Sequence, residues 1–173
     1  MQKYIKEVFS DYKEENNLIN SQIENINLYK KTNKLQVKVV SSSKIDLHEM
    51  QSFENYLITR FKVNKASLDI KYEGVEIMQD IPQNWNNILR YIAKKEPSST
   101  AFLRNSKVEI DNEKINVKLA MKGASFLIAQ KFDKGLEHLL ENLYNEKYTV
   151  EFIEDVDKNY EKLLSDQRKE EEK

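Results

Sequence analysis

The two histidines are the first residues to test for chemistry, because imidazole serves in both metal binding and acid–base catalysis. They are His48 and His138, far apart in the chain. His138 and Glu141 are spaced so that one helix face could present both to a metal ion, but a complete site needs further ligands and no second pair accompanies them. We therefore expect both histidines on helix surfaces, and we predict no metal ligand.

Nucleophilic and acid–base groups are not recognisable either. No serine or threonine has an evident base partner, and every acidic cluster fits a solvated helix face. Cysteine is absent, and three glycines are too few for a glycine-rich phosphate loop. We predict no catalytic residue, no cofactor-binding residue and no cofactor. A free-standing small enzyme stays open as an alternative, and it would need a deep polar pocket.

Lysines gather around one predicted hairpin. Alternate residues of a strand face one side, so Lys34 and Lys38 would line the outer face of a sheet. One interpretation is a weak nucleic-acid or acidic-partner surface. The other is a solvated face with lysines guarding an edge, which we favour because one local cluster is a small electrostatic footprint. The lysines of the candidate surface are Lys30, Lys31, Lys34 and Lys38, with Tyr29 among them and Lys44 nearby.

Composition excludes several classes of protein. A net charge of −1 argues against a dedicated DNA-binding module. No apolar run approaches the roughly 18 residues of a membrane span, and the N-terminus has no signal-peptide core. The absence of cysteine agrees with a reducing compartment. We expect a cytoplasmic protein with no membrane contact and no small-molecule substrate.

The elements that would position these side chains begin with an αββαβ unit over residues 1–76. An apolar stripe predicts a helix over residues 1–15. Alternation predicts strands over 26–30, 35–39 and 67–72. A capping box at Asp46 and Glu49 starts a helix that runs to about Phe61. The expected inward residues are Tyr4, Ile5, Val8, Phe9, Tyr12, Ile26, Leu28, Leu35, Val37, Val39, Leu47, Met50, Phe53, Leu57, Phe61, Leu68, Ile70 and Tyr72.

A second unit spans residues 80–154. Its predicted order is a helix over about 80–95, a helical turn at 101–103, strands at 107–110 and 114–119, a short helix with Phe126 to Ile128, a helix over 133–145 and a strand at 148–152. This αββααβ order resembles the type II KH arrangement, but the junction at 130–135 lacks the GxxG clamp. The charged composition of residues 155–173 predicts a linker or tail. A couple of helical turns are expected within it, supported by Val156, Tyr160, Leu163 and Leu164.

The two units have similar apolar patterns. Subtracting 80 aligns the strand at 114–119 with that at 34–39, and the helices at 85–92 and 5–12 also match. Duplication explains this, although two units of one plan can converge on such patterns. The sequence therefore predicts an α+β protein of two small domains, each a three-stranded sheet packed by helices, with the second KH-like.

The order of several segments resembles the N-terminal region of PolC-type DNA polymerase III, ahead of its OB fold. The resemblance spans about Val8 to Phe152. It rests on Ile26–Leu28, Lys34–Val39, Phe53–Leu57, Ala101–Ile110, Lys114–Leu119, Gly123–Leu127 and Tyr148–Phe152. The family often has Gly-Cys where this chain has Lys131-Phe132.

This resemblance implies a parent that is a DNA-directed DNA polymerase with a 3′–5′ exonuclease, whose metal-binding aspartates lie in later domains. It implies that the first domain resembles the polymerase-contacting terminal domain of the clamp loader's tau subunit. We expect a non-catalytic region that binds replisome proteins. A weak single-stranded nucleic-acid-binding module with possible DNA contact is the alternative.

Overall fold

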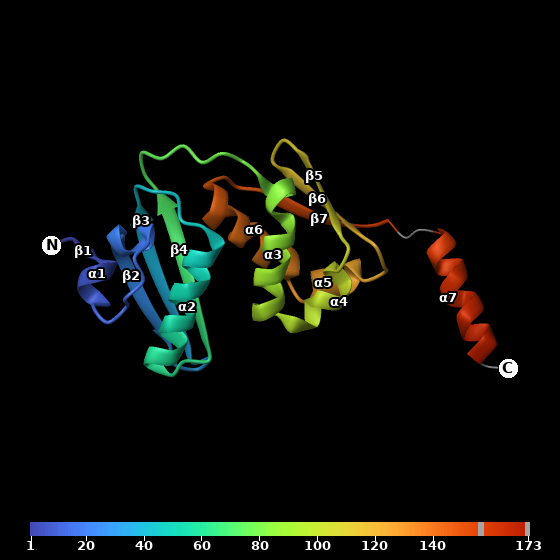
Figure 1. Cartoon of the computed structure of the whole chain (residues 1–173), viewed down its shortest axis with the longest axis horizontal. Helices are drawn as coiled ribbons and strands as arrows, with labels where there is room; N and C mark the ends of the chain where they lie inside the picture. The colour runs from blue at the N-terminus through green and yellow to red at the C-terminus, as the bar shows by residue number, and fades with distance from the viewer. Residues whose placement is uncertain (156–157, 172–173) are drawn as a thin grey trace. The chain divides into compact units, whose positions relative to one another are not determined.

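The chain forms two compact units of mixed α and β structure (Figure 1). A computed structural model describes residues 1–155 and 158–171. Unit 1 comprises Met1–Gln79 and Leu139–Glu146, and unit 2 comprises Asp80–His138 and Lys147–Lys173. Unit 1 holds a four-stranded sheet and unit 2 a three-stranded one. The predicted α+β class, with small sheets packed by helices, is confirmed.

Unit 1 is built on the sheet order β1-β2-β3-β4. β2 and β3 form an antiparallel hairpin, and β4 lies parallel to β3, so the connection between them must cross over the sheet. The crossover is α2. In chain order the elements are β1 (Lys3–Tyr4), α1 (Ile5–Val8), the 3₁₀ helix η1 (Asn17–Asn20), β2 (Gln22–Tyr29), β3 (Lys34–Ser41), α2 (Leu47–Phe61) and β4 (Lys65–Tyr72).

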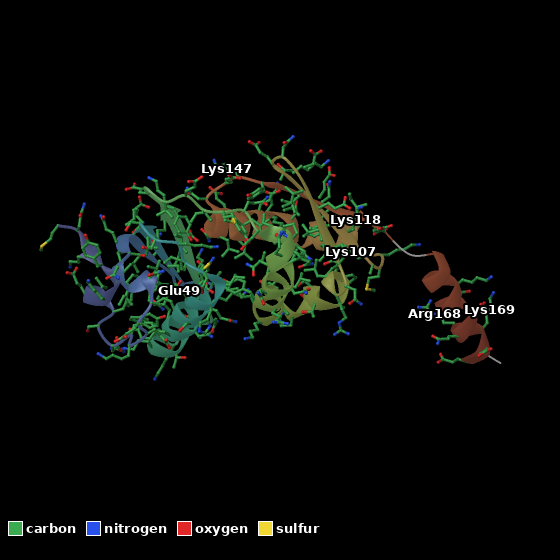
Figure 2. The ribbon with its side chains drawn as sticks, turned by 45° about the horizontal axis from the view of Figure 1, so that its top comes forward. Glu49, Lys107, Lys118, Lys147, Arg168 and Lys169 are labelled. Atoms are coloured by element: carbon green, nitrogen blue, oxygen red, sulfur yellow. The ribbon has the colours of Figure 1, made fainter. Side chains whose placement is uncertain are left out.

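The start of α2 is fixed by the capping box that the sequence predicts. The Asp46 carboxylate accepts from the Glu49 N–H at 2.9 Å, and the Asp46 N–H donates to Glu49 at 3.0 Å. Glu49, which is labelled in Figure 2, also accepts from the Asn17 N–H at 2.7 Å. Only 8% of this residue is exposed. One carboxylate therefore ties η1 to the first turn of α2.

The helix predicted over residues 1–15 is wrong, because α1 has only the four residues Ile5–Val8. After it the chain turns, with the Tyr12 N–H donating to the Phe9 carbonyl at 2.9 Å. The turn places Phe9 and Tyr12 edge-on to the Phe53 ring of α2, at 5.3 and 5.2 Å between centroids. Burial of these rings against α2 outweighs continuation of the helix.

Four of the predicted inward residues are exposed. Val8 of α1 is 40% exposed, Ile26 and Leu28 of β2 are 42% and 55% exposed, and Phe61 is 47% exposed. The register pairs Ile26 with Val37 and Leu28 with Leu35, so both β2 side chains share the face of the buried β3 residues. Alternation predicted the face correctly, but no element covers this part of it enough to bury the two side chains.

Unit 2 has the sheet order β5-β6-β7, with β5 antiparallel and β7 parallel to β6. Its expected helix starting near Asp80, helical turn and strands are present. In chain order the elements are α3 (Ile81–Lys95), the 3₁₀ helix η2 (Pro97–Ser99), α4 (Thr100–Leu103), β5 (Lys107–Asp111), β6 (Lys114–Leu119), α5 (Ala124–Ala129), α6 (Phe132–Tyr144), β7 (Thr149–Glu154) and α7 (Lys158–Glu171).

A close contact with an aromatic ring explains the glycine before α5. A Cβ atom at Gly123 would lie 2.1 Å from the Phe102 ring, which itself stacks on Phe126 at 4.7 Å. The Gly123 and Ala124 N–H groups donate to the Glu154 carboxylate at 3.0 and 3.1 Å, and these bonds lower the pKa of Glu154. Only a residue without a side chain fits between the ring and the start of this helix.

Two segments differ from the predicted organisation. α7 has fourteen residues, more than the couple of turns expected, while Val156 lies outside the described residues. The second half of α6, Leu139–Tyr144, belongs to unit 1, although the sequence assigns it to the second domain. The domain boundaries at 76, 80 and 154 stay a prediction.

The outer edge of β4 is closed by side chains. Glu54 of α2 accepts from the Leu68 N–H at 3.2 Å. The Asn142 amide accepts from the Ile70 N–H at 3.0 Å and donates to the Leu68 carbonyl at 3.1 Å. Glu54 and Asn142 are both buried. These bonds replace the ladder that a fifth strand would supply, so helix side chains close this edge.

Unit 2 closes its parallel edge strand in a related way. Glu137 of α6 accepts from the Val150 N–H of β7 at 3.0 Å. In both units a carboxylate from a helix therefore satisfies a backbone donor on the strand that lies parallel to its neighbour. Buried backbone groups need such partners, because an unpaired one costs a large part of a hydrogen bond.

Replacing Asn142 tests the edge of β4. We expect Asn142→Ala to lower the free energy of unfolding by about 1–3 kcal/mol, because it leaves a buried N–H and a buried carbonyl unpaired. Urea denaturation followed by circular dichroism measures the change. Glu141→Ala, an exposed neighbour on the same helix, should change it by less than about 0.5 kcal/mol. Equal effects of the two variants would contradict the role of Asn142.

Candidate functional site

The candidate lysines lie at one end and one face of the β2–β3 hairpin. Lys34 and Lys38 are half-buried on β3 and alternate with the buried residues that face α2, so they lie on the opposite, outer face. Lys30 and Lys31 are exposed in the turn between β2 and β3. The register adds Lys65 of β4 directly beside Lys34. The structure therefore brings the lysines together as the sequence predicts, but whether the surface binds anything stays a prediction.

A closed polar network occupies the centre of this outer face. Gln36 donates to Asp69 of β4 at 2.6 Å. The same side chain accepts from Tyr29 at 3.0 Å and from Asn27 at 3.2 Å. The register also places Asp69 beside Lys38. The carboxylate reduces the positive potential between the lysines, so the face is less basic than the lysine count suggests.

The two histidines lie exposed, on α2 and on α6. Within residues 1–155 and 158–171, no group of three or more His, Asp or Glu residues is arranged to hold a metal ion. In the same part of the chain, no helix is both long and apolar enough to cross a membrane.

Sequence reasoning missed a polar cluster at the margin of unit 1. Asp11 accepts from the Tyr56 hydroxyl and pairs with the Arg60 guanidinium at 2.6 Å. These bonds lower the pKa of Asp11, the bond from Tyr56 having the larger effect. Burial and the bond to Asp11 raise the pKa of Tyr56 to about 12. The sequence gives no signal for this cluster. Its residues are far apart in the chain and meet only because of the turn after α1.

The Asp11 cluster borders an open cleft of about 570 Å³ between the turn and α2. Tyr12, Ser52 and Thr59 also line it. The Asp11 carboxylate already accepts two hydrogen bonds from the α2 side chains, so it is not free to act as a general base. We call this set of contacts between Asp11, Tyr56 and Arg60 the Asp11 latch. The cluster therefore fastens the turn after α1 to the helix.

Comparison with known proteins places the chain in a family. A family model described as DNA polymerase III polC-type N-terminus II matches residues 83–173. A protein of Clostridium perfringens (strain 13 / Type A) named DNA polymerase III PolC-type is 24% identical over 170 residues, which cover 91% of this chain and 12% of that protein. No solved structure matches the chain significantly.

The chain therefore belongs to the DNA polymerase III polC-type N-terminus II family. It corresponds to the N-terminal region of PolC and spans about an eighth of the length of the curated relative. This agrees with the resemblance found in the sequence.

The Asp11 latch predicts a specific pH dependence. Because the pKa of Asp11 is lowered in the folded chain, its stabilising contribution is complete above the unfolded value of about 3.9 and is lost as the pH falls through the folded value. We expect Asp11→Asn to be less stable than the wild type near neutral pH, and the difference to shrink in acid.

Urea denaturation midpoints near neutral pH and below about pH 3 measure this difference. Glu14→Gln is the matched control, because Glu14 is an exposed carboxylate three positions further along the same segment. A deficit of Asp11→Asn that is the same at both pH values would contradict the latch.

Proposed function

We propose that this chain is the non-catalytic N-terminal interaction region of a PolC-type replicative DNA polymerase and that it binds protein partners in the replisome. The main support for this proposal is the match of residues 83–173 to a family model for an N-terminal segment of PolC-type polymerases. The relative extends far beyond the region that this chain matches, since the chain covers 12% of it. Polymerase and 3′–5′ exonuclease chemistry then belong to other parts of the whole protein, which acts in DNA replication in the cytoplasm.

Exposed apolar side chains on unit 1 support partner binding. Ile26 and Leu28 project from β2 on the face that carries the core, yet roughly half of each remains accessible. Apolar side chains that extend a core face to the surface are typical of protein interfaces. Because side chains close the outer edge of β4, a partner at this unit would contact side chains and not add a strand beside β4.

The proposed likeness of unit 2 to KH domains is supported by its topology. β5 and β6 are antiparallel, β7 is parallel to β6, and two consecutive helices, α5 and α6, connect β6 to β7. The junction between these helices has Lys131 in the left-handed region but no GxxG sequence. The unit therefore lacks the backbone clamp of nucleic-acid-binding KH domains, which favours a protein partner.

Capture from a lysate of the source bacterium tests the proposal. The purified chain as bait should enrich replication proteins, and a variant with Ile26→Asp and Leu28→Asp should lose them, because charge on the β2 face opposes burial against a partner. Quantitative mass spectrometry after cross-linking measures enrichment, and circular dichroism checks that the variant is folded.

Asn25→Asp is the control, because Asn25 is an exposed polar residue on the same strand. The purified chain should also show no nucleotide incorporation and no exonuclease activity. Either activity in the isolated chain, or identical capture by the wild type and the β2 variant, would contradict the proposal.

A second candidate function is weak binding of single-stranded nucleic acid by the lysine face. The observation that favours it is the alignment of Lys34, Lys38 and Lys65 on one side of the sheet, with the exposed Tyr29 beside them. Lysines that follow a backbone, together with an aromatic ring on which a base can stack, are the usual elements of such surfaces.

Titration of a fluorescent oligonucleotide tests this candidate. If Lys34 and Lys38 each contact a phosphate, replacing both by alanine should reduce the slope of log affinity against log salt by roughly 0.7 per lysine. Replacing Lys6 and Lys13, two exposed lysines of the same unit, should leave the slope unchanged. Absence of salt-sensitive binding at low ionic strength would remove the candidate.

A further inference from the structure

A cleft in unit 2 carries positive charge over an aliphatic floor. Pro97 ends α3, and the chain passes through η2 into α4, which packs beside the last turns of α3 (Figure 1). Between the two helices lies a cleft of about 290 Å³. Leu89 and Ala93 of α3 and Leu103 of α4 line it. Leu89 and Ala93 are one turn apart on α3, so they present one continuous apolar strip.

Two arginines line the same cleft. Arg90 comes from α3, and Arg104 follows α4 directly. Arg90 donates to the neutral side chain of Asn87 at 3.3 Å, and no carboxylate among the described residues pairs with it. In the described part of the chain no carboxylate pairs with Arg104, and none of the residues that line the cleft is acidic. Both guanidinium groups lie on exposed residues, so an anion can reach them.

We propose that this cleft binds an acidic peptide segment of a partner protein, with one aliphatic side chain on the strip of Leu89 and Ala93 and carboxylates at Arg90 and Arg104. This rests on the proposed function, in that the partner is a protein. Arginine presents a planar fork of donors that matches a carboxylate in two hydrogen bonds. Asn105, also in the lining, can bond to the backbone of an extended peptide.

Size and chemistry favour a peptide over other occupants. The volume lies just below the range of about 300–1,000 Å³ that is usual for small-molecule pockets, which favours a single side chain over a cofactor. A surface for single-stranded nucleic acid offers aromatic rings to the bases. The described lining contains no aromatic residue, and its floor is aliphatic.

Fluorescence anisotropy with a synthetic peptide tests the proposal on the whole chain. The probe contains several glutamates followed by leucine, with an amidated C-terminus, and its partner probe has glutamine at every glutamate. We expect the glutamate peptide to bind and to weaken with salt, and the glutamine peptide to bind far more weakly. Arg90→Met and Arg104→Met should each reduce affinity about tenfold, as expected for the loss of one charge-assisted hydrogen bond.

Two further variants make the result specific. Ala93→Glu places a carboxylate on the floor and should abolish binding, with a thermal melt confirming that the chain is folded. Lys147→Met removes an exposed positive charge elsewhere in unit 2 (Figure 2) and should leave affinity unchanged.

Equal binding of the two peptides, or equal losses in Arg104→Met and Lys147→Met, would overturn the proposal. So would displacement of the peptide from the cleft by an oligothymidine, which would assign the arginines to phosphate. The capture experiment with the β2 variant does not depend on this cleft, so failure here and failure of the proposed function are distinguishable.

Discussion

Closure of the outer edge of a parallel strand is the constraint on which both units depend. A strand parallel to its neighbour must be reached by a crossover, and here each crossover helix, α2 or α6, also supplies an acceptor for one free N–H of that strand. Glu54 bonds to Leu68, and Glu137 bonds to Val150. A slip of one residue would turn each strand's apolar side chains to the wrong face and remove the bonded N–H from its carboxylate. Helix position and strand register therefore determine each other.

This closure limits how a partner can bind. The edge of β4 has its Leu68 and Ile70 groups occupied by Glu54 and Asn142, so an added strand would have to displace buried side chains. Under the proposed function, a partner at this edge would therefore contact side-chain surfaces. In unit 1 the apolar residues of β2 offer such a surface, and in unit 2 the cleft between α3 and α4 offers another. If partners bind as we propose, apolar burial would give affinity at the first surface, and charge complementarity would give specificity at the second.

The sequence predicted those features that depend on interactions between residues close together in the chain. The capping box of Asp46 and Glu49 gave the start of α2, and alternation gave β6 at its observed bounds. The helix expected over residues 1–15 failed because contacts of Phe9 and Tyr12 with α2, distant in the sequence, outweighed a helical stripe. The exposure of Leu28 could not be predicted, because periodicity identifies a face but not what covers it. The gathering of Lys30, Lys31, Lys34 and Lys38 could be predicted because one hairpin contains them, whereas Lys65 joins them only through the register of β3 and β4. Arg90 and Arg104 share a cleft only through the turn at Pro97.

The distribution of paired charge separates structural surfaces from candidate binding surfaces. On the outer face of the second sheet Lys118 pairs with Glu109 at 2.7 Å, and Lys114 pairs with Glu151 at 2.8 Å. On the first sheet Asp69 lies between lysines and bonds to Gln36. Faces with paired charges interact well with water and present little net electrostatic potential to a ligand. Arg104 has no such carboxylate in the described part of the chain, and it stands beside an apolar floor. An uncompensated charge beside apolar surface gains most from a partner that supplies both a carboxylate and an aliphatic side chain. For this reason we propose the cleft as a binding site in preference to the outer faces of the two sheets.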